Sequence, residues 1–234
     1  MQKFERYEFK YILPKWVMNL VEDEIMHFMQ YDNFVKNKKD KSYFVRSLYF
    51  ENKENDNFYE KIDGLKFRKK YRIRSYSKSF DENLFLEQKA KDSDRVYKKR
   101  VNLKKNIFDK IINNRINELN FESSKEIDFF NDFTFKILTR REYPKIIIDY
   151  DRKPLISDYD SFFRISIDYN LVARNVSMDK EVGCLIDYKI MEVKFFRRIP
   201  LWFHRVIQKY NLKRVSISKF VVGMKFMGYA TDLS

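Results

Sequence analysis

The sequence predicts an α+β protein in which a closed antiparallel barrel of about eight strands is flanked by helices. Three observations lead to this fold. Apolar residues recur at every second position in many segments, as half-buried strands require. Stretches with one apolar stripe at helical spacing lie between these segments. The polar faces of the strands carry charged side chains, most of them basic, and a barrel would bring these faces together.

Eight segments have the alternation and the Tyr, Phe, Ile and Val content that strands favour. In chain order they are residues 4–11, 43–51, 66–77, 83–91, 95–103, 145–152, 162–169 and 185–196. Pro144 and Pro154 bracket the sixth segment, at positions where a strand tolerates proline. Residues 214–221 show the same alternation, so we expect a last strand there.

Four segments have the spacing of amphipathic helices: residues 14–30, 105–118, 124–139 and a shorter one at 200–210. Pro14 suits the first position of the first helix, because the N–H that it lacks needs no partner there. Each helix has a single apolar stripe, so each should pack on the sheet or cover its ends.

The chain of 234 residues suits one domain, residues 1–234, with a sizeable core. Its 48 Lys and Arg outnumber 34 Asp and Glu, and the net charge of +14 suits a polyanionic partner. The single cysteine, Cys184, and two distant histidines predict neither disulfides nor a metal site of thiolate or imidazole ligands. With no signal peptide and no apolar run of roughly 18 residues, we expect a cytoplasmic protein without a transmembrane segment.

Charged side chains repeat at every second position on one face of strand after strand. The groups that share a face are Arg6, Glu8 and Lys10; Arg68, Lys70, Arg72 and Arg74; Glu87 and Lys89; Lys98 and Arg100; Tyr150 and Arg152; Arg164, Ser166 and Asp168; and Glu192 and Lys194. Two placements fit this pattern. The charged faces point either into bulk water, as most polar strand faces do, or into the barrel, with the apolar faces packed against the helices.

The number of strands with this feature favours the inward placement. An open face with so many cations would be destabilised, because like charges on neighbouring strands repel. A polyanion would neutralise them, since arginine makes bidentate contacts to phosphate oxygens and lysine adds point charge. The fewer carboxylates suit a divalent metal ion that bridges phosphate oxygens. The pattern therefore predicts a site for triphosphates or phosphate chains.

Nine segments, taken together with their order and spacing, resemble a known family. They read RYEFKYIL, SLYFEN, KYRIRSY, FLEQKAK, VYKKRVNL, PKIIIDYDR, FRISID, MEVKF and SISKFVVGM. The set is similar to the VTC domain, the polyphosphate polymerase domain of the vacuolar transporter chaperone complex, within the CYTH-like superfamily of triphosphate tunnel metalloenzymes. The resemblance covers about residues 4–225.

The resemblance implies an eight-stranded antiparallel tunnel with a basic lumen, in which ATP and Mn²⁺ or Mg²⁺ bind. The terminal phosphoryl group of ATP would pass to a growing polyphosphate chain. The expected catalytic residues are Arg72, Arg74, Lys89, Lys194 and Lys219. The residues expected to bind phosphate or nucleotide are Lys10, Lys98, Arg100, Tyr150, Arg152, Arg164 and Ser218. Glu192 is the expected metal ligand, with Glu8 and Glu87 as further candidates.

Three functions remain open at this point. The polymerase is favoured over a metal-dependent triphosphatase or polyphosphatase of the same fold, because hydrolytic members often open with E-x-E-x-K. Here Arg6 takes the place of the first carboxylate, ahead of Glu8 and Lys10. The third function is a non-enzymatic module that binds polyphosphate or another polyanion, although Glu87 and Glu192 would hinder anion binding unless a metal sits on them. We expect no nucleic-acid partner; membrane-associated partner proteins and the oligomeric state are left open.

Overall fold

The computed structural model describes residues 7–92, 95–119 and 126–232, and it has the predicted α+β architecture with an antiparallel sheet. The strands in these ranges are β1 (Tyr7–Pro14), β2 (Met29–Tyr31), β3 (Tyr43–Glu51), β4 (Phe67–Ser75), β5 (Leu84–Asp92), β6 (Arg95–Leu103), β7 (Tyr143–Ser157), β8 (Arg164–Arg174), β9 (Glu181–Cys184) and β10 (Tyr188–Phe195). The helices are α1 (Lys15–Ile25), α2 (Asp56–Ile62), α3 (Lys105–Ile112), α4 (Ile127–Arg140), α5 (Leu201–Lys209) and α6 (Lys219–Phe226), with a 3₁₀ turn at Ile116–Glu118. Residue 6, with its arginine in place of a carboxylate, lies outside the described residues.

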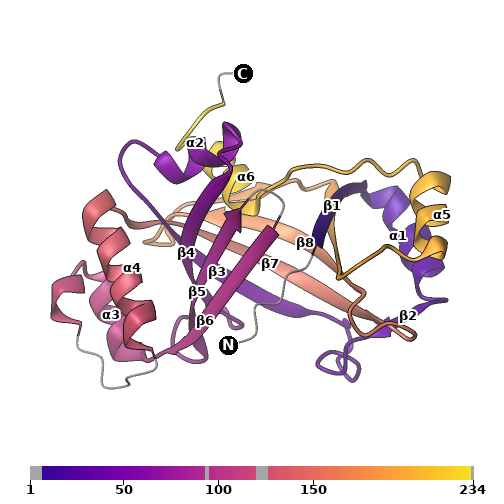
Figure 1. Cartoon of the computed structure of the whole chain (residues 1–234), viewed down its shortest axis with the longest axis horizontal. Helices are drawn as coiled ribbons and strands as arrows, with labels where there is room; N and C mark the ends of the chain where they lie inside the picture. The colour runs from indigo at the N-terminus through magenta and orange to yellow at the C-terminus, as the bar shows by residue number, and fades with distance from the viewer. Residues whose placement is uncertain (1–6, 93–94, 120–125, 233–234) are drawn as a thin grey trace.

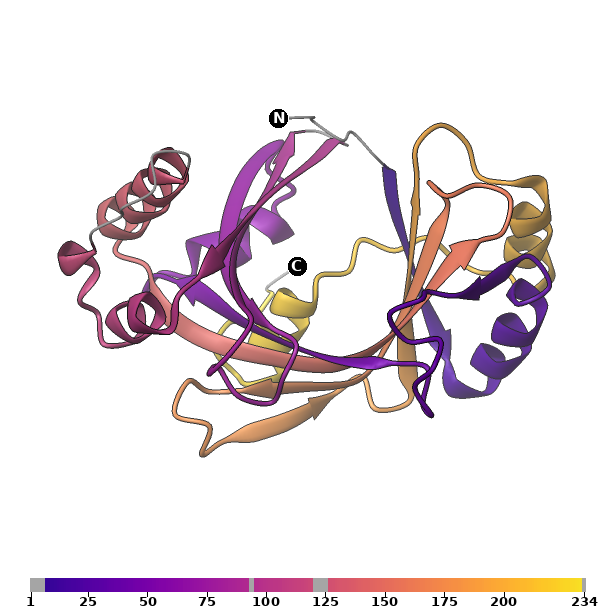
Figure 2. The same ribbon diagram turned by 90° about the horizontal axis from the view of Figure 1, so that it is seen from below.

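Eight strands form one continuous antiparallel path in the order β1-β10-β8-β7-β3-β4-β5-β6. The short strands β2 and β9 pair with β7 and β8 outside this path. The sheet curves strongly, so that β1 and β10 face the strands β4 to β6 across a concave inner face (Figure 2). In the described ranges no backbone ladder joins β1 to β6, so a closed, fully hydrogen-bonded barrel is not seen. A side-chain pair spans the gap instead, with Lys89 Nζ on β5 lying 3.2 Å from Glu8 Oε1 on β1.

Two pairs of helices cover the convex outer face at opposite ends of the sheet (Figure 1). The helices α1 and α5 bury Val21 and Phe203 in one core with β1, β8 and β10. The helices α3 and α4 bury Phe108 and Phe133 in a second core with β3, β4 and β5. The single apolar stripe of each helix thus finds the sheet surface that it needs. None of the helices in the described ranges combines the length and the apolar character needed to cross a bilayer.

Two predicted helices are shorter than expected. The first ends at Ile25, and residues 29–31 pair with β7 as β2 rather than continuing the helix. The second divides into α3 and the 3₁₀ turn, and Asn114 lies between them with φ of 58°. Asparagine tolerates this left-handed conformation, which interrupts a right-handed helix.

The strand predicted at residues 214–221 is wrong. This segment forms a single bridge, between Arg214 and Tyr11 of β1, and then becomes helix α6. The alternation that suggested a strand stops at Ser218, which stands at the start of the helix. The buried apolar residues that follow recur at helical spacing, and they are Phe220, Val221 and Met224.

Helix α6 lies within the concave side of the sheet rather than outside it, as Figure 2 shows in yellow. Its apolar residues form a third core with Ile146 and Ile148 of β7 and with residues of β8 and β9. Gly223 permits this close approach, because a Cβ there would overlap with Ile148 Cδ1. The helix therefore fills one end of the inner face and leaves the rest of it open.

Candidate active site

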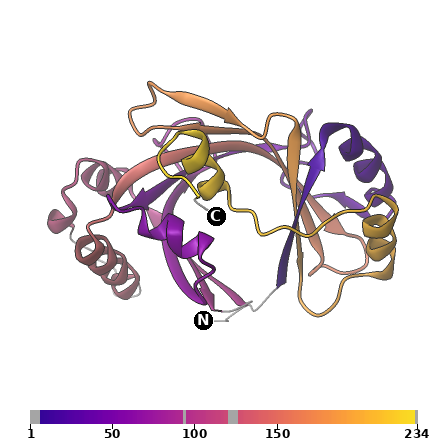
Figure 3. The ribbon, with the colours of Figure 1, turned by 90° about the horizontal axis from the view of Figure 1, so that it is seen from above.

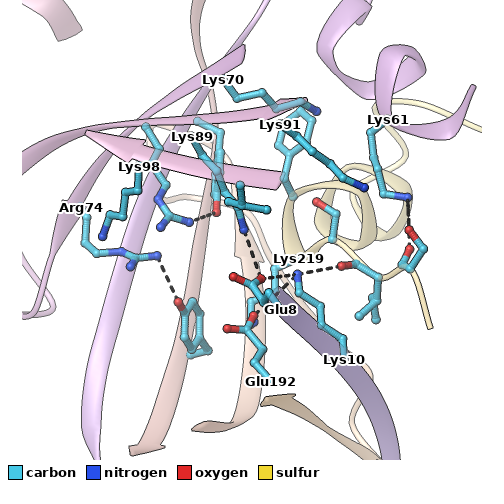
Figure 4. A pocket seen from close by; sticks show the side chains of 18 of the residues that line it. Glu8, Lys10, Lys61, Lys70, Arg74, Lys89, Lys91, Lys98, Glu192 and Lys219 are labelled. Carbon is cyan, nitrogen blue, oxygen red and sulfur yellow. Dashed lines mark hydrogen bonds and ion pairs between the residues drawn. The ribbon is translucent and has the colours of Figure 1, made fainter. Parts of the chain in front are cut away.

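A cavity of about 640 Å³ occupies the remaining part of the concave inner face. Twelve of the fifteen predicted site residues line it: Glu8, Lys10, Arg72, Arg74, Lys89, Lys98, Tyr150, Arg152, Glu192, Lys194, Ser218 and Lys219. Figure 4 shows several of them converging from β1, β4, β5, β6, β10 and α6. The charged strand faces therefore point inward, which confirms the second of the two placements that the sequence allows.

Three predicted residues do not line the cavity. Arg164 has an exposed side chain whose Nε donates a hydrogen bond to Ser161 O, at 3.2 Å. The Arg100 guanidinium lies over the Phe85 ring, 3.4 Å from the ring centroid, on β6 and β5. Glu87 is buried beneath the lining, with 1% of its side chain exposed.

Glu87 of β5 anchors the cations of its two neighbouring strands, β4 and β6. Its carboxylate lies 2.7 Å from Arg72 Nη2, 2.6 Å from Lys98 Nζ and 3.6 Å from Arg74 Nη1. The pairing follows from the register, which places Arg72 of β4 and Arg100 of β6 opposite Glu87 of β5. Burial disfavours the charged carboxylate, but the surrounding cations outweigh it and hold the pKa of Glu87 well below its usual range.

A second buried network joins β7, β8, β10 and α6. Arg152 binds Asp168 in a bidentate manner, at 2.6 and 2.7 Å, and its Nη2 donates to Glu192 Oε2 at 3.0 Å. Lys219 Nζ completes the network at 2.5 Å from Asp168 Oδ2 and 2.8 Å from Glu192 Oε1. Burial acts against the charge of Lys219, yet the two carboxylates raise the pKa of this lysine. Asp168 was not among the predicted site residues, although its place on the charged face of β8 indicated that it points inward.

Glu8 and Glu192 are the two carboxylates that reach the cavity surface among the described lining residues. Both lie near the same ammonium group, with Lys10 Nζ at 3.5 Å from Glu8 and 3.7 Å from Glu192. Oxygen ligands of this kind suit Mg²⁺ and Mn²⁺, which take their remaining ligands from water and substrate phosphates. Within the described ranges no group of three or more His, Cys, Asp or Glu residues is placed to hold a metal. The two carboxylates therefore fit a metal that is held jointly with a phosphorylated substrate.

Tyrosines complete the lining beside the two arginines. Arg72 Nη1 donates to Tyr49 Oη at 3.1 Å, and Arg74 Nη2 donates to Tyr150 Oη at 3.2 Å. Burial opposes ionisation of Tyr49, but the guanidinium groups of Arg72 and Arg74 lower the pKa of its hydroxyl below the ordinary value. Tyr49 was not predicted, because no basic residue alternates with it along β3.

Five further basic residues line the cavity without having been predicted as site residues: Lys61, Arg68, Lys70, Lys91 and Arg214. Lys61 lies on α2, and Arg214 lies in the segment between α5 and α6, which crosses the concave side in Figure 3. Lys61 lies on a helix and Arg214 forms only a single bridge, so neither belongs to one of the charged strand faces. Burial lowers the pKa of Lys70 to about 7, against the influence of Glu51 and Glu60.

The lowered pKa of Lys70 predicts a pH-dependent contribution to stability. The unfolded chain keeps this lysine protonated up to about pH 10.4, whereas the folded chain releases the proton near pH 7. The unfolded state therefore binds more protons between these values, and stability should rise with pH there. Urea denaturation of the wild type and of Lys70→Met at several pH values tests this. We expect the wild type to gain stability relative to the variant between pH 7 and about pH 10; parallel curves would contradict the lowered pKa.

Comparisons with known proteins identify a family and proteins of similar fold. The family model of the VTC domain covers residues 5–228. A putative adenylate cyclase from Bacillus halodurans is 13% identical, with a TM-score of 0.54 over 92% of this chain and 94% of that one. A putative adenylyl cyclase from Hippeastrum, described as having a dominant triphosphatase activity, is 11% identical, with a TM-score of 0.53 over 94% and 95%. No curated protein sequence matches the chain. The structural likeness shows a shared fold.

Proposed function

The chain belongs to the VTC domain family, and from this premise we propose that it is a phosphotransferase that lengthens polyphosphate with ATP. In the reaction, a terminal oxygen of the polyphosphate chain attacks the γ-phosphorus of ATP. The bond between that phosphorus and the β–γ bridging oxygen breaks, and ADP leaves with the electron pair. The polymer grows by one phosphate unit. This chemistry needs positioning and charge stabilisation more than covalent participation by the protein.

One observation carries the most weight for the proposal: two carboxylates lie among inward-pointing cations in one cavity. Arg72 and Arg74 face Glu8 and Glu192 across the inner face, and all four residues line the same space. The proposal requires the walls to enclose the substrate. We infer that the seam between β1 and β6 is closed by side chains such as Glu8 and Lys89, rather than by backbone hydrogen bonds.

The arginines are assigned to the transferring phosphoryl group. Both are held in place before substrate binds, Arg72 by Glu87 and Tyr49 and Arg74 by Tyr150, so little reorganisation is needed during the reaction. Their planar guanidinium groups can contact two phosphate oxygens each. Lys89, Lys194 and Lys219 supply further positive charge, and the remaining phosphate-binding residues are Lys10, Lys98, Arg152 and Ser218.

Glu8 and Glu192 are assigned to a divalent metal, Mn²⁺ or Mg²⁺. When bound there, such an ion would supply positive charge that offsets the negative charge developing as the phosphoryl group moves. Lys10 lies near both carboxylates and helps to balance their negative charge when no ion is bound. Glu87 is assigned a different role, because it is buried beneath the lining and does not reach the cavity. Arg100 and Arg164 do not line the cavity either, so they are assigned peripheral roles.

A triphosphatase is the second candidate function, since the Hippeastrum neighbour is described as having a dominant triphosphatase activity. Water would then take the place of the polyphosphate chain as the attacking group, and inorganic phosphate would be the product. The same cations and carboxylates would serve either reaction. What separates the two functions is the acceptor, so product analysis decides between them.

The deciding experiment incubates the purified protein with ATP and Mn²⁺ or Mg²⁺ and separates the products on a gel stained for polyphosphate. We expect a metal-dependent ladder of polymers that is lost in Glu192→Gln, because this variant lacks one of the two carboxylates assigned to the metal. Glu181→Gln, a change at an exposed glutamate of β9, serves as the control and should keep the ladder. Release of phosphate without polymer would select the triphosphatase instead.

A further inference from the structure

A second surface of the molecule carries exposed aromatic rings and arginines outside the cavity. It is built from two connections, residues 158–163 between β7 and β8 and residues 196–200 between β10 and α5. Figure 2 shows both connections beside α5, on the side of the molecule away from α3 and α4. The exposed side chains there, with the first residue of α5, are called the aromatic–arginine patch. Its members are Tyr159, Phe162, Phe196, Arg197, Arg198 and Leu201.

The apolar members of the patch face solvent together. The exposed fractions are 58% for Phe162, 46% for Phe196 and 80% for Leu201. The rings of Phe162 and Phe196 contact each other, with centroids 6.0 Å apart, so the two connections form one surface. Single exposed apolar side chains are ordinary on a protein surface, but a contiguous group of them marks an interaction site.

The patch stands on a well-packed base. Phe163, the next residue after Phe162, is fully buried. Its ring contacts those of Trp202 and Phe203 on α5, with centroids 5.6 Å apart in both pairs. The turn itself is held by Asp160, whose Oδ1 accepts a hydrogen bond from Phe162 N at 2.8 Å. The exposed rings are therefore positioned before any partner arrives, and little further ordering is needed on binding.

Arginines surround the exposed rings without a carboxylate to neutralise them. Arg197 and Arg198 have exposed side chains, and neither forms an ion pair within the ranges that the structure describes. The Arg197 guanidinium carbon lies 5.9 Å from the centroid of the Phe196 ring. Arg164, at the start of β8, donates from Nε to the neutral Ser161 O at 3.2 Å and forms no ion pair in those ranges either.

Acidic residues offset this charge only in part. Asp158 and Asp160 lie on the connection between β7 and β8. On α5, the exposed Arg205 lies four residues after Leu201, so both side chains share one face of the helix. Arg205 and the three arginines described above thus stand against two aspartates, and the surface is positive as well as apolar.

We propose that the aromatic–arginine patch docks on a bilayer that contains anionic phospholipids. Phe162, Phe196 and Leu201 enter the boundary between headgroups and acyl chains, where exposed apolar side chains lose contact with water. The arginines meet lipid phosphates, and each basic residue near such a surface raises the affinity about fivefold. None of the patch residues lines the cavity, so this surface is independent of the proposed function.

The composition of the patch favours a bilayer over a protein partner. A protein would need carboxylates at fixed positions opposite Arg197 and Arg198, together with pockets for the projecting rings. A fluid lipid surface instead supplies phosphates that move to meet the arginines. Tyr159, which is 83% exposed, has the apolar ring and polar tip that favour the boundary between water and lipid.

The test is co-sedimentation of the purified protein with vesicles of phosphatidylcholine, with or without about 30% phosphatidylserine, at about 0.15 M salt. Each sample is measured with and without tripolyphosphate, which competes for the basic cavity. We expect the wild type to sediment with the phosphatidylserine vesicles alone. Arg197→Gln/Arg198→Gln should lower the partition coefficient about thirtyfold. Phe162→Ser/Phe196→Ser, which leaves the charge unchanged, should lower it about tenfold.

Matched controls remove the same charge or an exposed ring elsewhere on the molecule. Lys53→Gln/Lys99→Gln removes two exposed positive charges outside the cavity lining. Phe135→Ser removes a ring of α4 that is 67% exposed. Both controls should bind vesicles as the wild type does, and every variant should keep the wild-type melting temperature.

Several results would overturn the proposal. One is equal sedimentation of the patch variants and the controls, and another is a wild type that binds neither kind of vesicle. Vesicle binding that tripolyphosphate abolishes and the patch variants retain would place the contact in the cavity. A concentration-dependent dimer without vesicles, lost in Phe162→Ser/Phe196→Ser, would assign the patch to a second copy of the chain instead.

Discussion

Replacing Arg72 by alanine should lower kcat/KM for ATP about a thousandfold, which corresponds to about 4 kcal/mol of transition-state stabilisation. The guanidinium of Arg72 is held at 2.7 Å from Glu87 and at 3.1 Å from the Tyr49 hydroxyl, and it lines the cavity. A donor fixed in this way stabilises developing charge without reorganising, so its loss affects the transition state more than substrate binding. Initial rates of polymer formation at several ATP concentrations measure the effect.

The fold should survive this change, because Glu87 keeps Lys98 at 2.6 Å and Arg74 at 3.6 Å when Arg72 is removed. Arg72→Lys should recover part of the lost rate, since lysine restores the charge but not the bidentate geometry. Arg205→Ala, which removes an exposed arginine on α5, serves as the control for charge alone. A normal rate in Arg72→Ala, with an unchanged melting temperature, would place the phosphoryl transfer away from β4.

Most of the predicted residues that line the cavity share one property: they lie on regular strands. Arg72, Arg74 and Lys89 alternate with apolar neighbours, and a period of two places them on one face whatever the tertiary structure. The inward direction of that face was then favoured by like-charge repulsion, and the cavity lining confirms it. Most strand positions in the cavity lining were therefore predictable, although Arg100 and Arg164 are exceptions that do not line it.

Two other basic residues of the lining, Lys61 and Arg214, were not predictable in this way, because they reach the cavity from outside the sheet. Lys61 lies on α2, a helix of seven residues that is too short to show helical periodicity. Its first turn is fixed by the buried carboxylate of Glu51, which accepts hydrogen bonds from the N–H groups of Asn57 and Phe58 at 3.0 and 2.9 Å. This contact depends on how β3 packs against α2, and that packing cannot be predicted from the sequence of either element alone.

In the segment before α6, a short alternating pattern predicted a strand that the structure does not contain. Val215 and Ile217 alternate with serines, and Val215 N does donate to Lys10 O of β1 at 2.8 Å. The pairing ends after one bridge because the chain must turn into the concave side as α6. The prediction of Lys219 as a site residue nevertheless fits the cavity, since the first residue of this helix lies beside Glu192. Its place came from the resemblance to the family rather than from the strand.

Replacing Glu87 by glutamine should be the most destabilising single change at the site. The carboxylate is 1% exposed and lies within 4 Å of Arg72, Arg74, Lys98 and Arg100. The amide leaves these cations close together without a counter-charge, and removing one partner of a buried ion pair typically costs about 3–5 kcal/mol. Urea denaturation should show this loss in the free energy of unfolding. Tripolyphosphate should then stabilise the variant more than the wild type, because a bound polyanion replaces part of the missing charge.

The control for Glu87→Gln is Asp109→Asn, which removes a carboxylate from an exposed pair. Asp109 lies 2.9 Å from Lys105 on α3, with about half of each side chain exposed, 50% and 45%. Solvent screens such a pair, so its loss should change the free energy of unfolding by less than about 0.5 kcal/mol. If the two variants were equally stable, Glu87 could not be the anchor that holds the basic side chains of β4 and β6 together. The arginines would then owe their positions to the tyrosines alone, and the preorganisation assigned to Arg72 would lose its physical basis.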